Sequence, residues 1–276
     1  MLKSSLKAGL RRALPLALRK KLAIAIHQSR WLPERQRQWW SQQVVSDFAS
    51  VDASEYHKFL WANHMAYART YDVEHRFGDG KLNKTREMLL EDLGLLLEKQ
   101  GLVPERDVLS VFDVGCSLGY LLRHLETGLF AGAKRLTGID IDAQAIRDGD
   151  HHLKALGSKV ALQTADMESL PGLLGAESYD VFLCTGVLMY LTQPKAQQVV
   201  KTILAHTKVV ACFAGLADPG VDNAKTQASS LRAEDGSFIH NIDKMVELAG
   251  GRVVFRRWEG ARLVDGNTVY FVFAAP

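Results

Sequence analysis

The chain has 276 residues, of which 47% are hydrophobic and 24% are charged. These values are typical of a globular protein and exclude wholesale disorder. No uncharged apolar run approaches the roughly 20 residues that a membrane-spanning helix needs. The three cysteines are far apart and form no CxxC pair, which indicates neither a disulfide framework nor a zinc site. We therefore predict no metal site and a reducing compartment.

The formal net charge of +3 conceals an asymmetry, because residues 1–30 contain eight basic and no acidic side chains. A basic helix with an apolar face can lie on an anionic bilayer. This predicts a cytoplasmic protein with a peripheral membrane contact through residues 1–30 at the inner face of the membrane. The alternatives are a helical appendage packed on its own domain or in a homo-oligomer, a secretory signal, and a transit peptide. Nucleic acid is disfavoured as a partner, because the acidic remainder offers no continuous basic track.

Residues 1–100 are predicted to form a helical N-terminal extension, because apolar residues recur there at helical spacing. We expect helices at Leu16–Ile26, Ala53–Thr70 and Lys84–Gln100. Asp52 can cap the second of these helices, and Gly101 follows the third as a stop signal.

Aromatic and histidine side chains recur at helical spacing along the second helix, from Tyr56 to Tyr71. This stripe either packs the helix onto the rest of the protein as core or forms a lid over a ligand. In the lid interpretation, His64, Tyr67 and Tyr71 contact the ligand.

The pattern changes after Pro104, where short apolar strands alternate with amphipathic helices. This alternation predicts an α/β domain over residues 101–276 with a mainly parallel sheet. The expected strands are Val108–Asp113, Arg135–Asp140, Val160–Thr164, Asp180–Cys184, Val209–Ala214, Arg252–Trp258 and Thr268–Ala274. The expected helices are Leu118–Glu126, Ala143–Leu156, Pro194–Ala205 and Ile242–Ala249. Since only Glu259–Asn267 joins the last two strands, they should pair as an antiparallel hairpin.

A glycine-containing turn, Asp113-Val114-Gly115-Cys116-Ser117-Leu118-Gly119, follows the first strand. A strand that enters a helix through such a turn brings backbone amides and a helix N-terminus to a ligand. The spacing differs from the GxGxxG fingerprint of dinucleotide-binding proteins. Asp113 would repel a pyrophosphate but suits a ligand with a positive centre.

Polar residues also follow the next three strands. Asp140 stands at the tip of the second strand, where a carboxylate can accept hydrogen bonds from both hydroxyls of a ribose. Asp142 is better explained as the cap of the next helix. Asp166 follows the third strand, and Thr185-Gly186 follows the fourth. All four segments lie at the carboxyl ends of successive strands, where open α/β sheets bind ligands.

Together these segments resemble those of the class I S-adenosylmethionine-dependent methyltransferases. The first is similar to the family pattern (D/E)xGxGxG, with Ser117 at the middle glycine. The resemblance covers about residues 105–275 and implies a Rossmann-like, seven-stranded fold and the cofactor S-adenosylmethionine. In the family, residues matching Asp140, Ile141, Asp166 and Met167 contact the ribose and the adenine. The cofactor-binding residues implied are Asp113, Gly115, Cys116, Gly119, Asp140, Ile141, Asp166, Met167, Thr185 and Gly186.

The methyl acceptor is constrained less closely. The fourth segment lacks the (D/N)PP(Y/F) signature of enzymes that methylate amino groups of bases and glutamine, which favours an oxygen acceptor. We expect a hydroxyl of a small molecule, a sugar or a membrane-associated glycan, bound by the N-terminal helices and the long segment Ala217–Asn241. The alternatives are a catalytically silent cofactor-binding or assembly subunit, an N-methyltransferase acting on a small molecule or protein, and a nucleotide-dependent oxidoreductase or epimerase.

His240 lies near the end of that long segment, and several small-molecule O-methyltransferases use a histidine in this region as a base. The ordinary pKa of histidine suits this task near neutrality. In the structural alternative, Asn241 caps the next helix and His240 merely precedes it. Arg232 pairs with an acidic acceptor or is a solvated loop residue. The predicted catalytic residues are His240, Tyr190 and His64, and the predicted acceptor-binding residues are Tyr67, Tyr71 and Arg232.

Overall fold

The computed structural model describes residues 14–66, 76–78 and 81–276. Its centre is a seven-stranded sheet with the strand order β3-β2-β1-β4-β5-β9-β8. The strands are β1 (Ser110–Val114), β2 (Arg135–Asp140), β3 (Val160–Thr164), β4 (Tyr179–Thr185), β5 (Thr207–Ala214), β8 (Arg252–Val264) and β9 (Asn267–Ala275). Strand β9 pairs antiparallel with β5 and β8, and the other pairs are parallel. The predicted Rossmann-like sheet with an antiparallel C-terminal hairpin is confirmed.

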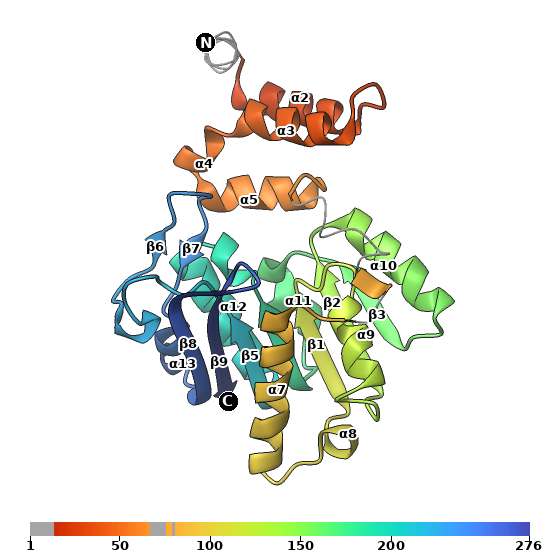
Figure 1. Ribbon diagram of the computed structural model, residues 1–276, viewed down its shortest axis with the longest axis vertical. Helices are drawn as coiled ribbons and strands as arrows, with labels where there is room; N and C mark the ends of the chain where they lie inside the picture. Colours follow the sequence, from red (N-terminus) through yellow and green to blue (C-terminus); the bar gives the residue numbers. More distant parts are fainter. Residues whose placement is uncertain (1–13, 67–75, 79–80) are drawn as a thin grey trace.

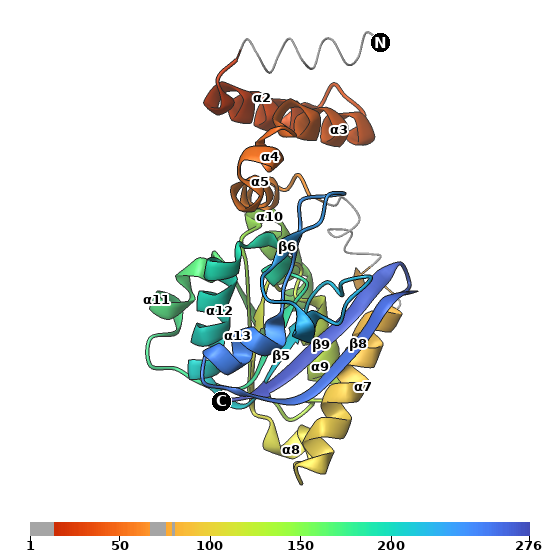
Figure 2. The same ribbon diagram turned by 90° about the vertical axis from the view of Figure 1, so that its left-hand side faces the viewer.

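Helices cover both faces of the sheet, as Figures 1 and 2 show. Because side chains alternate along a strand, Val111 belongs to the hydrophobic cluster of one face and Phe112 to that of the other. The first face packs against α7 (Lys84–Lys99), α9 (Tyr120–Thr127) and α10 (Ala143–Ala155). The second face packs against α11 (Leu170–Leu174), α12 (Gln193–Ala205) and α13 (Ile242–Leu248). Short elements complete this part: α8 (Pro104–Asp107), η2 (Met167–Ser169), η3 (Leu188–Tyr190), η4 (Asn223–Lys225), β6 (Ser230–Leu231) and β7 (Phe238–Ile239).

The N-terminal helices form a separate layer with a small core of its own. They are α2 (Leu16–Gln28), α3 (Glu34–Val45), α4 (Phe48–Val51) and α5 (Ala53–Ala62). Ala23, Val45 and Leu60 bring α2, α3 and α5 together in this core. In both views α5 lies between the sheet and the α2–α3 pair. Within the described ranges, no helix is long and apolar enough to cross a membrane.

Helix α7 packs with the sheet rather than with the N-terminal layer. Leu89, Leu93 and Leu97 are buried in the hydrophobic cluster of the first face. Asp92, which is 5% exposed, pairs with Arg257 of β8 at 2.6 Å. The domain boundary near residue 100 stays a prediction, although this packing places α7 with the sheet.

The limits of two expected elements differ most from those in the structure. The helix expected over Ala53–Thr70 ends at Ala62, because His64 has a positive φ of 57° that breaks the helix; residues 67–70 lie outside the described part. The Glu259–Asn267 connection is mostly strand, since β8 continues to Val264 and a tight turn at Asp265 and Gly266 leads into β9.

Gly149 lets α10 approach the β1–α9 loop closely. A Cβ atom at this position would lie 2.3 Å from the backbone oxygen of Leu118. We expect Gly149→Ala to lower the free energy of unfolding by about 1–3 kcal/mol, the usual cost of overpacking. Gly172→Ala in α11, where a Cβ meets no atom within 4 Å, is the control and should be neutral or stabilising. Chemical denaturation measures both, and equal stabilities would contradict the assigned contact.

Candidate active site

A cavity of about 780 Å³ opens at the carboxyl ends of the strands, a size common for small-molecule sites. The predicted site residues that line it are Gly115, Asp140, Ile141, Asp166, Met167, Thr185, Gly186, Tyr190 and Arg232. The described residues Asp113, Cys116, Gly119, His64 and His240 do not line it. Tyr67 and Tyr71 lie outside the described residues.

The loop between β1 and α9 forms one wall of this cavity. Gly115 has a φ of 80°, and a Cβ atom there would lie 2.2 Å from Val187 Cγ1, so the position requires glycine. Ser117 stands at the middle glycine of the family pattern and also has a positive φ, 52°. Its N–H donates to Asp140 Oδ2 at 2.8 Å. This bond holds a non-glycine residue in the backbone conformation that the motif uses.

Asp140 connects the loop after β1 with the loop after β2 through hydrogen bonds. Besides Oδ2, which accepts from Ser117, its Oδ1 accepts the Asp142 N–H at 2.9 Å. Burial raises the pKa of Asp140, while these backbone N–H groups oppose the rise. Each carboxylate oxygen has two lone pairs, so a residue on the cavity wall with these bonds can still accept hydrogen bonds from ligand hydroxyls.

Asp142 is buried beside this loop and connects it to the N-terminal layer. Its Oδ1 accepts the N–H groups of Gln144 and Ala145 at 2.9 and 3.0 Å, which confirms its predicted role as a helix cap. His64 Nδ1 lies 2.9 Å from Asp142 Oδ2. His64 is thus engaged by the cap of α10, outside the cavity lining, and its catalytic role stays a prediction.

Asp113 is buried beneath the loop between β1 and α9, and Arg86 is near enough to interact with it electrostatically. Asp113 is 2% exposed, and its Oδ1 has no hydrogen-bond partner among the described residues. Burial raises the pKa of Asp113 to about 7, and the guanidinium of Arg86 opposes this rise. Arg86 lines the cavity, with its guanidinium carbon 5.2 Å from the centre of the Tyr120 ring. This pair of opposite charges suits a ligand that carries both an ammonium and a carboxylate.

Helix α5 closes the other side of the cavity. The ring of Tyr190, from η3, lies 4.9 Å from His57 and 5.5 Å from Trp61, measured between ring centres. His57 is 6% exposed, whereas Trp61 lines the cavity. The aromatic stripe of this helix therefore contributes both to the core and to the cavity wall.

Sequence reasoning missed several residues of the wall, among them Lys58, Trp61 and Arg86. All three precede the recognised motifs. The aromatic stripe indicated that α5 had a role, but helical spacing alone does not show which members face a ligand. No sequence signal distinguished Arg86 from the other charged residues of α7.

His240 lies behind the cavity wall and is 3% exposed. Its Nε2 lies 3.0 Å from the carbonyl oxygen of Leu188, which can only accept, so Nε2 carries the hydrogen. The Ser229 hydroxyl then donates to Nδ1 at 2.6 Å. Burial lowers the pKa of His240. With both ring nitrogens engaged, the geometry fits a residue that fixes η3, and the predicted role as a base stays untested.

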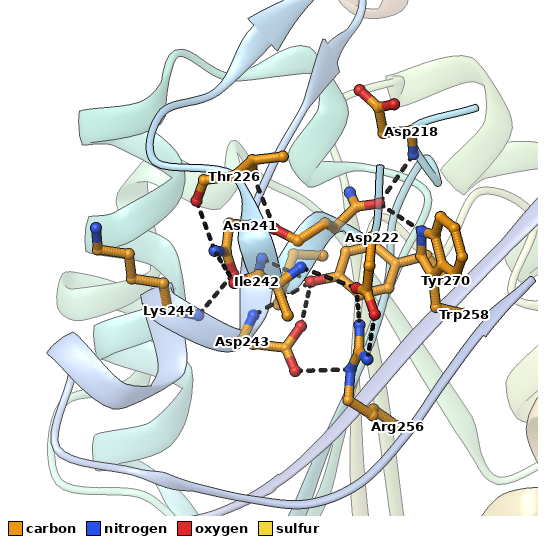
Figure 3. Close-up of polar contacts among 12 residues, drawn as sticks. Asp218, Asp222, Thr226, Asn241, Ile242, Asp243, Lys244, Arg256, Trp258 and Tyr270 are labelled. Carbon is orange, nitrogen blue, oxygen red and sulfur yellow. Dashed lines mark hydrogen bonds and ion pairs between the residues drawn. The ribbon is translucent and has the colours of Figure 1, made fainter. Parts of the chain in front are cut away.

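The long segment between β5 and α13 is fastened to the C-terminal strands by polar contacts (Figure 3). Asn223 Nδ2 donates to the His240 carbonyl at 2.7 Å, and its Oδ1 accepts from Trp258 Nε1 at 2.9 Å. Arg256 of β8 donates from one guanidinium nitrogen to Asp222 Oδ2 at 2.9 Å. Arg232, on the cavity wall, donates from Nε to Asp235 Oδ1 at 3.0 Å. This part of the wall is therefore an ordered surface.

Comparisons with known proteins agree with this geometry. Residues 111–209 match the family model described as a methyltransferase domain. The solved structure of magnesium protoporphyrin IX methyltransferase (ChlM) from Synechocystis PCC 6803 with bound SAM is 17% identical, with a TM-score of 0.53 over 79% of this chain and 95% of that chain. A S-adenosylmethionine-dependent methyltransferase from Clostridium acetobutylicum ATCC 824 is 11% identical, with a TM-score of 0.52 over 76% and 98%. CalS10, an amino pentose methyltransferase from Micromonospora echinaspora, is 14% identical, with a TM-score of 0.51 over 75% and 98%. No curated protein sequence matches the chain.

The matched family model and the solved structures show different things about this chain. The likeness to the solved structures concerns the fold, while the family model covers the four strand-end motifs. Residues 111–209 are thus similar to a methyltransferase domain, and the sheet has the fold of class I S-adenosylmethionine-dependent methyltransferases.

The contacts of His240 generate a direct test of its role. In His240→Ala, the Leu188 carbonyl and the Ser229 hydroxyl lose their partner in a buried site. We expect the free energy of unfolding to fall by about 2–4 kcal/mol. His151→Ala, on the exposed side of α10, is the matched control. Loss of methyl transfer at unchanged stability, measured by denaturation, would instead support the role as a base.

Proposed function

We propose that the chain transfers a methyl group to a hydroxyl of a small molecule, a sugar or a membrane-associated glycan. The observation that carries this proposal is the shared cavity. One side is lined by Asp140 and Asp166, from the motif loops, and the other by Tyr190, Trp61 and Arg232. Such a cavity has room for a nucleoside cofactor beside an acceptor.

The cofactor side fits a zwitterionic nucleoside. Asp140 accepts hydrogen bonds from the ribose hydroxyls, and Ile141 packs on the adenine. Asp166 accepts from the adenine amino group, with the Met167 amide beside the ring. At the other end, Arg86 forms no ion pair with a carboxylate of the described residues. It interacts with Asp113 only at longer range. Its guanidinium complements the carboxylate of the methionine part.

The remaining predicted contacts follow from the loops themselves. Gly115, Thr185 and Gly186 line the cavity where β1 and β4 end and flank the methionine part. Asp113, Cys116 and Gly119 lie beneath the same wall and support the shape of the first loop. In particular, the buried carboxylate of Asp113 favours a cation above it.

The acceptor side aligns a hydroxyl for in-line displacement. S-adenosylmethionine, when bound, supplies the methyl group of its sulfonium. Trp61 and Tyr190 present apolar and aromatic surface that excludes water and stacks on a ring, and Arg232 adds polar recognition. Among the predicted catalytic residues we favour Tyr190, whose hydroxyl orients the acceptor and assists loss of its proton, because Tyr190 lines the cavity.

We also propose that the protein works at the inner face of a membrane, with contact through residues 1–30 and the turn that follows them. Trp31, between α2 and α3, is 95% exposed, and Leu18 and Trp39 are 49% and 39% exposed. Arg30 and Arg35 flank Trp31 and are exposed as well. Exposed tryptophan among basic side chains suits the headgroup region of an anionic bilayer.

Asp140→Ala tests the cofactor assignment. Loss of the carboxylate leaves ribose hydroxyls and backbone N–H groups without a partner, so S-adenosylmethionine should bind about 1–3 kcal/mol more weakly. Calorimetry measures the affinity, and Asp150→Ala on the outer side of α10 is the control.

Incubation of cell extract with methyl-labelled cofactor, followed by mass spectrometry, identifies the acceptor. Cofactor binding without transfer to any acceptor would favour a silent binding subunit.

The membrane contact has its own test by vesicle co-sedimentation. The full chain should bind vesicles that contain phosphatidylglycerol and not vesicles of phosphatidylcholine alone. Joint substitution Arg30→Glu and Trp31→Glu should weaken this binding about tenfold or more, because it removes charge attraction and the apolar anchor. Leu248→Glu, at an exposed site on α13, is the control. Equal binding by all three proteins would reject the contact.

A further inference from the structure

Lys58 of α5 reaches from the N-terminal layer into the candidate cofactor site. It lines the cavity together with Asp166 and Glu168, which follow β3. Its Nζ forms an ion pair with Asp166 Oδ2 and lies 3.1 Å from Glu168 Oε1. The bond with Asp166 is the main reason why the pKa of Lys58 is raised. A residue 108 positions away in sequence from Asp166 thus contacts its carboxylate directly.

The two oxygens of Asp166 have different tasks. Oδ1 accepts the backbone N–H of Glu168 at 3.0 Å and caps η2. Oδ2 contacts Lys58 and retains a lone pair for a further donor. With a partner at each oxygen, the plane of the carboxylate is fixed before a ligand arrives. Preorganised acceptors of this kind lose little entropy on binding.

A second lysine makes a similar bridge that omits Asp166. Lys195 of α12 lies 3.1 Å from Glu55 of α5 and 3.1 Å from Glu168. It therefore ties the same helix to the same loop, and among the described residues it forms no ion pair with Asp166. The two lysines allow docking of α5 to be separated from orientation of Asp166.

We infer that Lys58 is a positioning residue, which orients the Asp166 carboxylate toward the exocyclic amino group of the cofactor adenine. This inference rests on the proposed role of Asp166. It makes the N-terminal layer part of the cofactor recognition machinery, because the orienting cation comes from α5. Adenine selectivity therefore depends on a contact between two parts of the chain that are distant in sequence.

The experiment measures binding of S-adenosylhomocysteine and of its analogue with hydrogen in place of the 6-amino group. Lys58→Met should bind S-adenosylhomocysteine about three- to tenfold more weakly, as expected for loss of one charge-assisted contact. Its preference for the amino compound should fall toward that of Asp166→Asn. Lys58→Arg should restore the preference, and Lys195→Met should leave it unchanged.

A double-mutant cycle shows whether Lys58 acts through Asp166. The variant with both Lys58→Met and Asp166→Asn should bind no more weakly than Asp166→Asn alone. Additive losses, or equal weakening for both ligands, would overturn the positioning role, as would an equal loss of selectivity in Lys195→Met. If the unmodified protein does not bind S-adenosylhomocysteine, the proposed function is overturned together with this inference. If it binds and only the variants behave otherwise than expected, the inference alone is overturned.

Discussion

The candidate site depends on the carboxylate of Asp140, which holds two loops in place at once. It accepts the N–H of Ser117, which has a positive φ of 52°, and that of Asp142, which begins the next helix. A serine in this backbone conformation is unfavourable without such a partner. The departure from glycine in the first motif is thus compensated by the acidic residue of the second. The bond explains how this loop accommodates serine at a position with a positive φ.

Acidic residues after β2 and β3 also fasten the N-terminal layer. Asp142 contacts His64, and Asp166 and Glu168 contact Lys58. The same loops that face the cavity therefore anchor α5 above it. Because the ion pairs of Lys58 are partly exposed, each contributes little to stability by itself. Their main effect is on the shape of the cavity, because they hold α5 in the position where Lys58 and Trp61 form its outer wall.

The sequence predicted the sheet well, because the sheet depends on local patterns, and most of the residues singled out at the strand ends line the cavity. Most of β5 is a continuous apolar run, and the residues of the other strand-end motifs stand at or just after the ends of their strands. Helix length was harder, since the break at His64 has no glycine or proline signal. The side chains that wall the cavity from outside, Lys58 and Trp61, could not be predicted because their position depends on packing between distant segments. His240 shows the same limit: its place in the chain suggested chemistry, while its partners, Leu188 and Ser229, emerge only from the fold.

The contacts of His240 connect the C-terminal strands to Tyr190, which we propose contacts the acceptor. Its ring holds the Leu188 carbonyl, and its own carbonyl is held by Asn223, which in turn contacts Trp258 of β8. Tyr190 lies two residues after Leu188 and is packed by α5 from the other side. The position of its ring is thus set jointly by the C-terminal strands and the N-terminal layer. Under the proposed function, substitutions in either part would therefore alter how the acceptor is held.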